Sequence, residues 1–352
     1  ALDAGITGQL EVGDEVYYNV KIMRTLPDSI IIRHSKGIAQ IPMEELPLKW
    51  QRQLGYDPAK AEAFRQAVAA KEAERKAEAA KKAAAKPPAP PASTTTVADR
   101  VLPLFGTAPV IAERVDLRPD FRELGLYAKD QGRRPSCAVF SVVSALEYQQ
   151  AKNRGQAKRL SEEYLIWATR KSLGLEQAAL NDPADLTGDA DLGFTLMEVV
   201  QALRAYGIAD ADSMPNTFGK RMAEITEPDK TTVTEARERR QVHAFSVTGR
   251  SNEARLERIF HLLNNDVPVV VGMAWPHYRT LRSPLISQQN PRPGSGHAVT
   301  LVGYKSETGN AEDARFLFKN SWGPQWGNAG YGWVTWEYLR QHLGSAVFLD
   351  CQ

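Results

Sequence analysis

Three polar side chains stand out in this chain of 352 residues because their types and order fit nucleophilic chemistry at a carbonyl carbon. Cys137, one of only two cysteines, begins the apolar helical pattern of residues 137–152. His297 opens an apolar strand-like run, and Asn320 ends another. A thiol attacks a carbonyl when an imidazole takes its proton, and the imidazole works only when a third group fixes its orientation. The three residues therefore predict acyl transfer through a thioester.

The ionisation of Cys137 decides whether this chemistry can proceed, since only the thiolate is a good nucleophile. A helix N-terminus carries partial positive charge and an adjacent imidazolium carries a full one, and both lower a thiol pKa. We therefore expect the Cys137 thiol to ionise near neutral pH beside His297. Each residue alone has a plainer interpretation, as a core cysteine, a structural histidine or an asparagine in a turn. Their combination favours the catalytic interpretation.

Gln131 is a fourth candidate, because attack on an amide also needs help at the carbonyl oxygen. That oxygen gains negative charge, and hydrogen-bond donors must stabilise it. The side-chain amide of Gln131 and the backbone N–H of Cys137 are suitable donors for such an oxyanion. No CxxC or HExxH spacing occurs, and two isolated cysteines cannot build a zinc site. We therefore expect no metal and no cofactor.

The local sequences around these residues are DQGRRPSCAVFS at 130–141, GHAV at 296–299 and KNSWG at 319–323. In order, residue type and local sequence they resemble the papain family of cysteine peptidases. Further segments, with the sequences VDLR, LSEEYL and GF, extend the likeness to most of residues 112–352. The combination of four motifs makes this resemblance specific.

The resemblance implies an α+β fold with a helical half and a β-barrel half, between which Cys137 and His297 face each other across a cleft. It implies hydrolysis of peptide bonds in protein or peptide substrates, with Cys137 as nucleophile and His297 as general acid and base. Asn320 would orient the imidazole. Gly193 matches the glycine that pairs with the substrate backbone in that family. We expect Trp322 to be a second substrate-binding residue and to shield the hydrogen bond between His297 and Asn320.

Four positions depart from the family pattern near the nucleophile. Arg134 stands where members usually have a disulfide-bonded cysteine, and Pro135 and Ala138 replace the usual glycine and tryptophan. Leu192 replaces the first of a glycine pair. The missing disulfides indicate a bacterial or otherwise divergent member. The usual helical inhibitory propeptide is not recognisable, so residues 1–96 are not a standard prodomain.

Composition changes along the chain and predicts four segments. Residues 1–56 alternate short β-rich runs with turn residues, which predicts a small all-β module similar to an SH3 domain. Residues 57–86 are rich in Ala, Glu and Lys with few large apolar side chains, so we expect a charged helical spacer. Residues 87–97 form a Pro/Thr-rich linker and 98–352 the peptidase domain. The N-terminal module could bind a partner, tether the enzyme or occupy the cleft.

In the last segment helical patterns come first and strand patterns follow, which is typical of an α+β fold. The expected helices are 137–152, 161–171, 196–206 and 252–263, and the expected strands are 268–275, 297–304, 315–320 and 332–336. The loop 281–296, rich in Pro, Ser and Gln, leads directly into His297. We expect this loop to border the primed side of the cleft.

Bulk composition excludes several classes of partner. Lys and Arg total 44 against 42 Asp and Glu, so the net charge of +2 gives no field that favours nucleic acid. No apolar run is long enough to span a bilayer. The chain starts at Ala1 rather than Met, which a removed secretion signal or a trimmed boundary would explain. We expect a secreted or periplasmic protein, although scarce cysteine fits the cytoplasm equally.

Two alternative functions belong to other classes. The first is a papain-like fold that only binds, as a scaffold, which the substitutions at Pro135 and Ala138 favour. Retention of the cysteine, histidine, asparagine and glutamine favours an enzyme instead. The second alternative keeps the thioester but passes the acyl group to an amine, or cleaves an amide of the cell wall. A measured thiol pKa separates the first alternative from the enzyme, and product analysis with added amines reveals the second.

Overall fold

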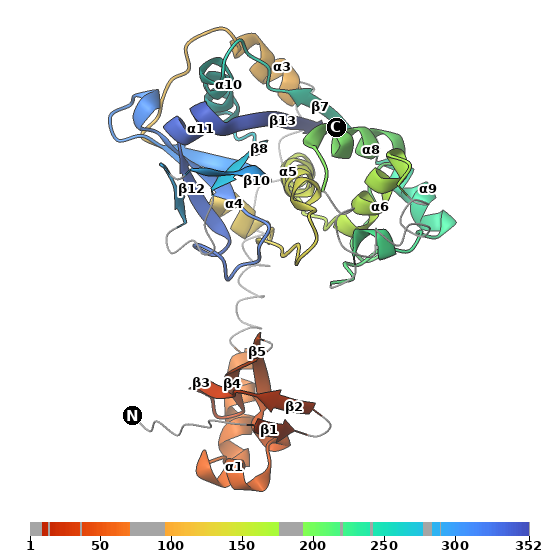
Figure 1. Ribbon diagram of the computed structural model, residues 1–352, viewed down its shortest axis with the longest axis vertical. Coiled ribbons are helices and arrows are strands. Elements are labelled where there is room, and N and C mark those ends of the chain that lie inside the picture. The colour runs from red at the N-terminus through yellow and green to blue at the C-terminus, as the bar shows by residue number, and fades with distance from the viewer. Residues whose placement is uncertain are drawn as a thin grey trace. The chain divides into compact units, whose positions relative to one another are not determined.

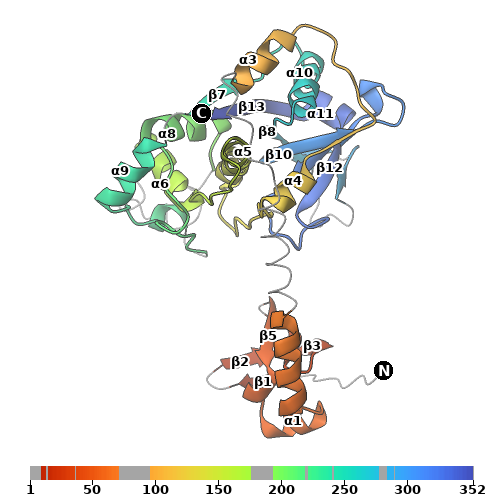
Figure 2. The same ribbon diagram turned by 180° about the vertical axis from the view of Figure 1, so that it is seen from behind.

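The computed structural model describes residues 9–12, 15–35, 37–70, 96–175, 193–218, 221–239, 242–276, 284–288 and 290–351. The chain divides into two compact units, residues 1–89 and 90–352. Figures 1 and 2 show the elements of both units from opposite sides. No helix among the described residues is both long and apolar enough to cross a bilayer.

The N-terminal unit is built on short antiparallel strands. Its elements are β1 (Gln9–Val12), β2 (Glu15–Tyr18), β3 (Lys21–Thr25), β4 (Ser29–His34), β5 (Gly37–Pro42), the 3-10 turn η1 (Met43–Glu45) and α1 (Leu48–Gln53), followed by a helix at 58–70. β1 pairs with β2, and β3, β4 and β5 form a second sheet. Alternate residues of β4, Ile30 and Ile32, are fully buried. Asn19 has a φ of 53° and separates β2 from β3 within the β-rich run of residues 15–25.

The second unit has a large sheet with helices packed against both of its faces. Its helices are α3 (Val97–Val101), α4 (Arg118–Glu123), α5 (Cys137–Arg154), α6 (Glu162–Ser172), α8 (Leu196–Tyr206), α9 (Lys230–Glu238), α10 (Asn252–Asn264) and α11 (Trp336–His342). Short 3-10 turns are η2 (Leu102–Leu104), η4 (Met222–Glu224) and η5 (Ala311–Asp313). α5 lies between α6, α8 and α9 on one side and the strands on the other (Figure 1).

Eight strands of the described residues form one sheet in this unit. They are β6 (Arg114–Asp116), β7 (Val242–Ser246), β8 (Val269–Pro276), β9 (Leu285–Ile286), β10 (Pro291–Lys305), β11 (Arg315–Lys319), β12 (Tyr331–Thr335) and β13 (Leu343–Cys351). Their order is β7-β13-β8-β10-β11-β12-β9, and β6 pairs with β10. All described pairs are antiparallel except β9 with β12.

Strand alternation divides the apolar side chains between two cores. Successive residues of a strand point to opposite faces of the sheet. Val269 and Val271 of β8 pack with α10 and the far strands, whereas Val270 packs with α5, α6 and α8. On β10, Val299 belongs to the first core and Ala298 to the second. The central strands are therefore buried on both faces, which fixes the position of every side chain along them.

The expected α+β class is confirmed. Each expected helix of the second unit matches an observed helix within one residue at its start and two at its end. The strand expected at 297–304 is the second half of a longer strand, because β10 already begins at Pro291. α3 begins at Val97, the last residue of the expected linker. Residues 71–86 of the expected spacer and 87–95 of the linker lie outside the described residues.

Candidate active site

Cys137 is the first residue of α5, as expected. Thirteen of the 18 residues of this helix are buried, and Gly155 ends it in the left-handed conformation. A helix buried on most of its surface has one fixed position between the two halves of the unit. Ser136 precedes it without a side-chain cap, so the N-terminal N–H groups of the helix stay available at the thiol.

His297 lies on β10, where it is paired with Met273 of β8. Its Nε2 is 2.7 Å from Oδ1 of Asn320, the residue that follows β11. The same Oδ1 accepts the backbone N–H of Ser321 at 2.8 Å, so it is an acceptor and His297 Nε2 must be the donor. This assignment leaves Nδ1 without a proton in the neutral ring and able to accept one.

Cys137 and His297 lie on opposite sides of the interface between the helical half and the sheet half of the unit. The backbone N–H of Ala298, next to His297, donates to Cys137 Sγ at 3.4 Å. Both side chains line one groove of about 830 Å³, named here the active-site groove. Its helical wall includes Pro135, Cys137, Ala138, Gly193, Phe194, Thr195, Leu196 and Glu198, and its sheet wall includes Gly272, Met273, Ala274, Pro291, Gly294, Ser295, Gly296, His297, Ala298, Gly344 and Ser345.

Two tryptophans enclose the imidazole. The ring of Trp275 meets His297 edge to face at 4.5 Å, and that of Trp322 lies tilted against it at 4.7 Å. They also contact each other, and only 8% of His297 is exposed. Trp322 packs on the imidazole, as expected, and is not among the residues that line the groove. Trp275 was not among the site residues expected from the sequence, and its position beside His297 follows from the pairing of β8 with β10.

Gln131 is buried in a loop between the halves. Its side-chain oxygen accepts from the Ser321 hydroxyl at 2.5 Å, and its backbone N–H donates to the Ser321 carbonyl at 2.9 Å. Its Nε2 donates to the carbonyl of Arg134 at 2.8 Å. An amide nitrogen has two protons, so one remains for another acceptor. Ser321 adjoins Asn320 and thereby links Gln131 to the imidazole, a contact not expected from the sequence.

Gly193 lies in the groove wall opposite the sheet. Its φ is 79°, and a Cβ at this position would lie 2.7 Å from the carbonyl oxygen of Pro135. Any larger residue would therefore push α8 away from the loop that carries Cys137. Residues 291–296, expected to belong to a loop, are the first part of β10, and Pro291, Gly294 and Ser295 line the groove.

Burial shifts the pKa values of the central pair in opposite directions. It raises the pKa of the Cys137 thiol, although the N–H groups of Ala298, Ala138 and Cys137 oppose this. It lowers the pKa of His297 to about 4, although the hydrogen bond to Asn320 opposes that shift. Both directions favour a neutral thiol beside a neutral imidazole, which differs from the ion pair expected from the sequence. Among the described residues, no group of three or more His, Cys, Asp and Glu could hold a metal ion.

Curated relatives share part of this chain. It is 25% identical over 225 residues to cathepsin K of Gallus gallus, covering 62% of this chain and 59% of that protein. It is 28% identical over 214 residues to the viral cathepsin of Spodoptera litura multicapsid nucleopolyhedrovirus, covering 60% of this chain and 55% of the relative. The matched part is thus less than two thirds of either relative.

A solved structure supports the fold. The crystal structure of xylellain, a cysteine protease from Xylella fastidiosa, matches with a TM-score of 0.55 at 20% identity, covering 70% of this chain and 91% of that one. The family model described as papain family cysteine protease matches residues 111–338, which is more than half of the chain. The resemblance seen in the sequence motifs is thereby confirmed, and the chain belongs to the papain family of cysteine proteases.

Proposed function

We propose that this protein is a cysteine peptidase that hydrolyses peptide bonds in protein or peptide substrates through a thioester. The observation that carries the proposal is the hydrogen bond of 2.7 Å between His297 and Asn320, beside a thiol at the start of α5 in the same groove. This arrangement gives the nucleophile a base whose tautomer and ring orientation are fixed.

In the first half of the reaction, Cys137 Sγ attacks the substrate carbonyl carbon while its proton passes to His297 Nδ1. The neutral pair that burial favours suits this step, because the imidazole starts as a free base. The carbonyl oxygen becomes an oxyanion at the N-terminus of α5. The backbone N–H of Cys137 and the second amide proton of Gln131 stabilise it there.

Collapse of this intermediate breaks the C–N bond, and His297 returns the proton to the leaving amine. The acyl group stays on Sγ as a thioester. Water then loses a proton to His297 and attacks the thioester carbonyl, which releases the carboxylic acid product and restores the thiol. Asn320 keeps its hydrogen bond to Nε2 of His297 throughout the reaction. Nδ1 of the same ring therefore transfers the proton both when the thioester forms and when it is hydrolysed.

The groove itself fits an extended chain rather than a small molecule. It is open, it runs between the two halves and it is lined by small and apolar side chains. Phe194 offers apolar surface in the groove, next to the nearly buried Leu196 and Met273, and Gly193 presents its backbone to a substrate strand. We propose that the start of β10, which leads into His297, borders the primed side of this groove.

One observation favours the binding-only alternative. The pKa of the Cys137 thiol is raised by burial, and a thiol that stays protonated near neutral pH is a weak nucleophile. A catalytic thiol and a binding module therefore predict different behaviour toward an alkylating agent.

Replacement of the nucleophile tests the proposal. Cys137→Ala should lower kcat for a library of peptide substrates by at least about 10⁴-fold, because removal of a catalytic nucleophile leaves only binding and oxyanion stabilisation. It should also abolish labelling by an epoxide inhibitor, measured by mass spectrometry. Cys351→Ala is the matched control, since Cys351 is 3% exposed and lies outside the groove.

Retained turnover in Cys137→Ala would place the chemistry elsewhere. A wild-type protein that binds peptides without cleaving them would support the binding module, and transfer of the acyl group to added amines would support the transferase. We also propose that the protein is secreted or periplasmic, which cell fractionation would test. We propose that the N-terminal module binds a partner, which pull-down with residues 1–89 would test.

A further inference from the structure

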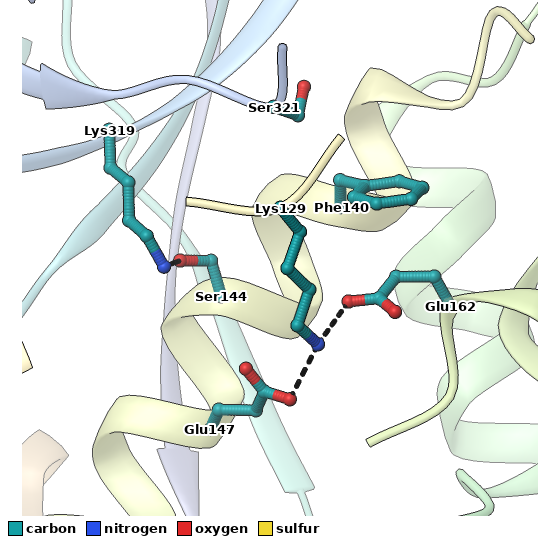
Figure 3. A pocket seen from close by; sticks show the side chains of 7 residues that line it. All are labelled: Lys129, Phe140, Ser144, Glu147, Glu162, Lys319 and Ser321. Atoms are coloured by element: carbon teal, nitrogen blue, oxygen red, sulfur yellow. Dashed lines mark hydrogen bonds and ion pairs between the residues drawn. The ribbon is translucent and has the colours of Figure 1, made fainter. Parts of the chain in front are cut away.

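The loop that carries Gln131 begins and ends with a cation whose partner is buried. Lys129 Nζ lies 2.7 Å from Glu147 and 2.5 Å from Glu162, as the dashed lines of Figure 3 show. Five residues later, Arg134 Nη1 lies 2.8 Å from Glu163. Glu162 and Glu163 are neighbours in the first turn of α6. One helical turn therefore holds both ends of the loop.

The pair between Arg134 and Glu163 is almost completely enclosed. Their side chains are 5% and 1% exposed. Arg134 also donates to Asn216 Oδ1 at 2.7 Å, and the Thr217 hydroxyl donates to the second oxygen of Glu163. Buried charges are tolerated when they are paired and their remaining hydrogen-bonding groups are satisfied. Removing one partner would leave the other charge unpaired in the interior.

Arg134 reaches the candidate oxyanion donor through its own backbone. Its carbonyl oxygen accepts the Nε2 proton of Gln131 at 2.8 Å and the backbone N–H of Ser136 at 2.8 Å. The other end of the Gln131 amide is held by the Ser321 hydroxyl. The carbonyl of Arg134 thus fixes which way the amide nitrogen points, and the guanidinium fixes the position of that carbonyl.

We propose that the ion pair between Arg134 and Glu163 braces the loop, and that Arg134 is a positioning residue acting through Gln131. The inference rests on the proposed peptidase function, in which Gln131 stabilises the oxyanion. Arg134 occupies the position where the family resemblance places a disulfide-bonded cysteine in other members. A charge pair here holds the loop without oxidation of any thiol, which suits a chain whose two cysteines are both free.

A double-mutant cycle on kcat and KM tests this. Gln131→Ala should lower kcat by about 10²–10³-fold, the usual loss for an oxyanion donor. Arg134→Ala should lower kcat by at least about 10-fold with KM changed less than about twofold, since misplaced donors affect the transition state. The double variant should be no more than about twofold slower than Gln131→Ala alone, because the two residues act as one unit.

Two further variants keep the test decisive. Arg134→Lys should recover most of the rate, because it keeps the charge opposite Glu163 although it loses the fork that also reaches Asn216. Glu163→Gln removes the charge opposite Arg134 but preserves the shape of the site. It takes the place of Arg134→Ala in the measurements if Arg134→Ala does not fold. Arg239→Ala is the matched control: its pair with Asp210 at 2.8 Å lies in the same half and touches neither Gln131 nor the loop.

Hydrogen exchange gives a readout that needs no activity. The amides of Gln131 and Ser136 should exchange at least about 10-fold faster in Arg134→Ala than in wild type, while amides of α10 stay unchanged, because the brace acts locally. Additive losses of kcat, or unchanged exchange at both amides, would overturn the brace. If the wild-type protein cleaved no peptide, the proposed peptidase function would be wrong. The exchange rates would still test whether the ion pair between Arg134 and Glu163 holds the loop.

Discussion

The two walls of the active-site groove hold their functional side chains by different means. On the sheet wall, His297 and Asn320 are placed by strand pairing and by two tryptophans. No ion pair is found at His297 among the described contacts of that wall. Beside the helical wall, the loop with Gln131 is joined to residues 321–323 by two backbone hydrogen bonds and carries, at both ends, a cation paired with a buried carboxylate.

Because they are held differently, the two walls should be sensitive to different substitutions. A ladder of backbone hydrogen bonds and packed rings is insensitive to a single lost charge, but it is sensitive to a cavity. A loop held by ion pairs tolerates changes in packing better than the loss of one charge, because the remaining charge is left in a poorly solvated interior. The following predictions separate these two responses, beginning with the largest expected effect.

Trp275→Ala should weaken the sheet wall most. The side chain is 7% exposed and packs against His297, Trp322 and Phe318. Truncation should cost roughly 3–5 kcal/mol of unfolding free energy, measured in urea, because a large cavity forms. It should also lower kcat, since the imidazole loses one of its two supporting rings.

Trp336→Ala is the control for this variant, because it removes a half-buried ring from α11 that does not touch His297. It should lower stability and leave kcat unchanged. Equal loss of kcat in the two variants would mean that the wall responds to general destabilisation rather than to the missing ring.

Acid should destabilise the protein through His297. Burial holds the pKa of His297 at about 4, below the ordinary 6.5, so the unfolded chain takes up this proton first as the pH falls. The stability contributed by the neutral ring is present above pH 6.5 and decreases toward pH 4, by roughly 3 kcal/mol. Urea unfolding of wild type and of His297→Asn between pH 7.5 and 4 measures this contribution of His297 to the free energy of unfolding.

The difference in the free energy of unfolding between wild type and His297→Asn should change with pH only between about pH 6.5 and 4. A constant difference would mean that His297 ionises in the folded protein as it does in the unfolded chain. An increase in the unfolding free energy contributed by His297 as the pH falls from 7.5 toward 6.5 would instead support the thiolate–imidazolium pair expected from the sequence, because an ion pair raises the imidazole pKa. Thiol alkylation that persists at acid pH would agree with that pair.

Asn320→Ala should lower kcat by about 10²-fold with a smaller effect on KM, because a loosely held imidazole spends little time in the productive orientation. The hydrogen bond from His297 Nε2 and that from the Ser321 N–H both end on the lost oxygen. Asn328→Ala, on an exposed turn nearby in sequence, should leave the rate unchanged. Equal rates for the two variants would contradict the orienting role.

The helices and most strands of the second unit could be predicted because their apolar periodicity is strong. The extension of β10 to Pro291 could not, because the residues before His297 are proline, glycine and serine, which are typical of a loop. Asn19 likewise interrupts a continuous β-rich run through a local φ of 53° that composition does not reveal. In both places the pairing with other strands, rather than local preference, decided where the strand runs.

The sequence alone determined the family, the fold class and the identity of the candidate nucleophile, base and orienting amide, because these depend on residue types within short motifs. Only the tertiary structure showed Trp275 against the imidazole and Arg134 paired with Glu163, since these contacts join residues that are far apart in the chain. It also set the protonation preferences of Cys137 and His297. Desolvation depends on everything that surrounds a group, and no local sequence specifies that environment.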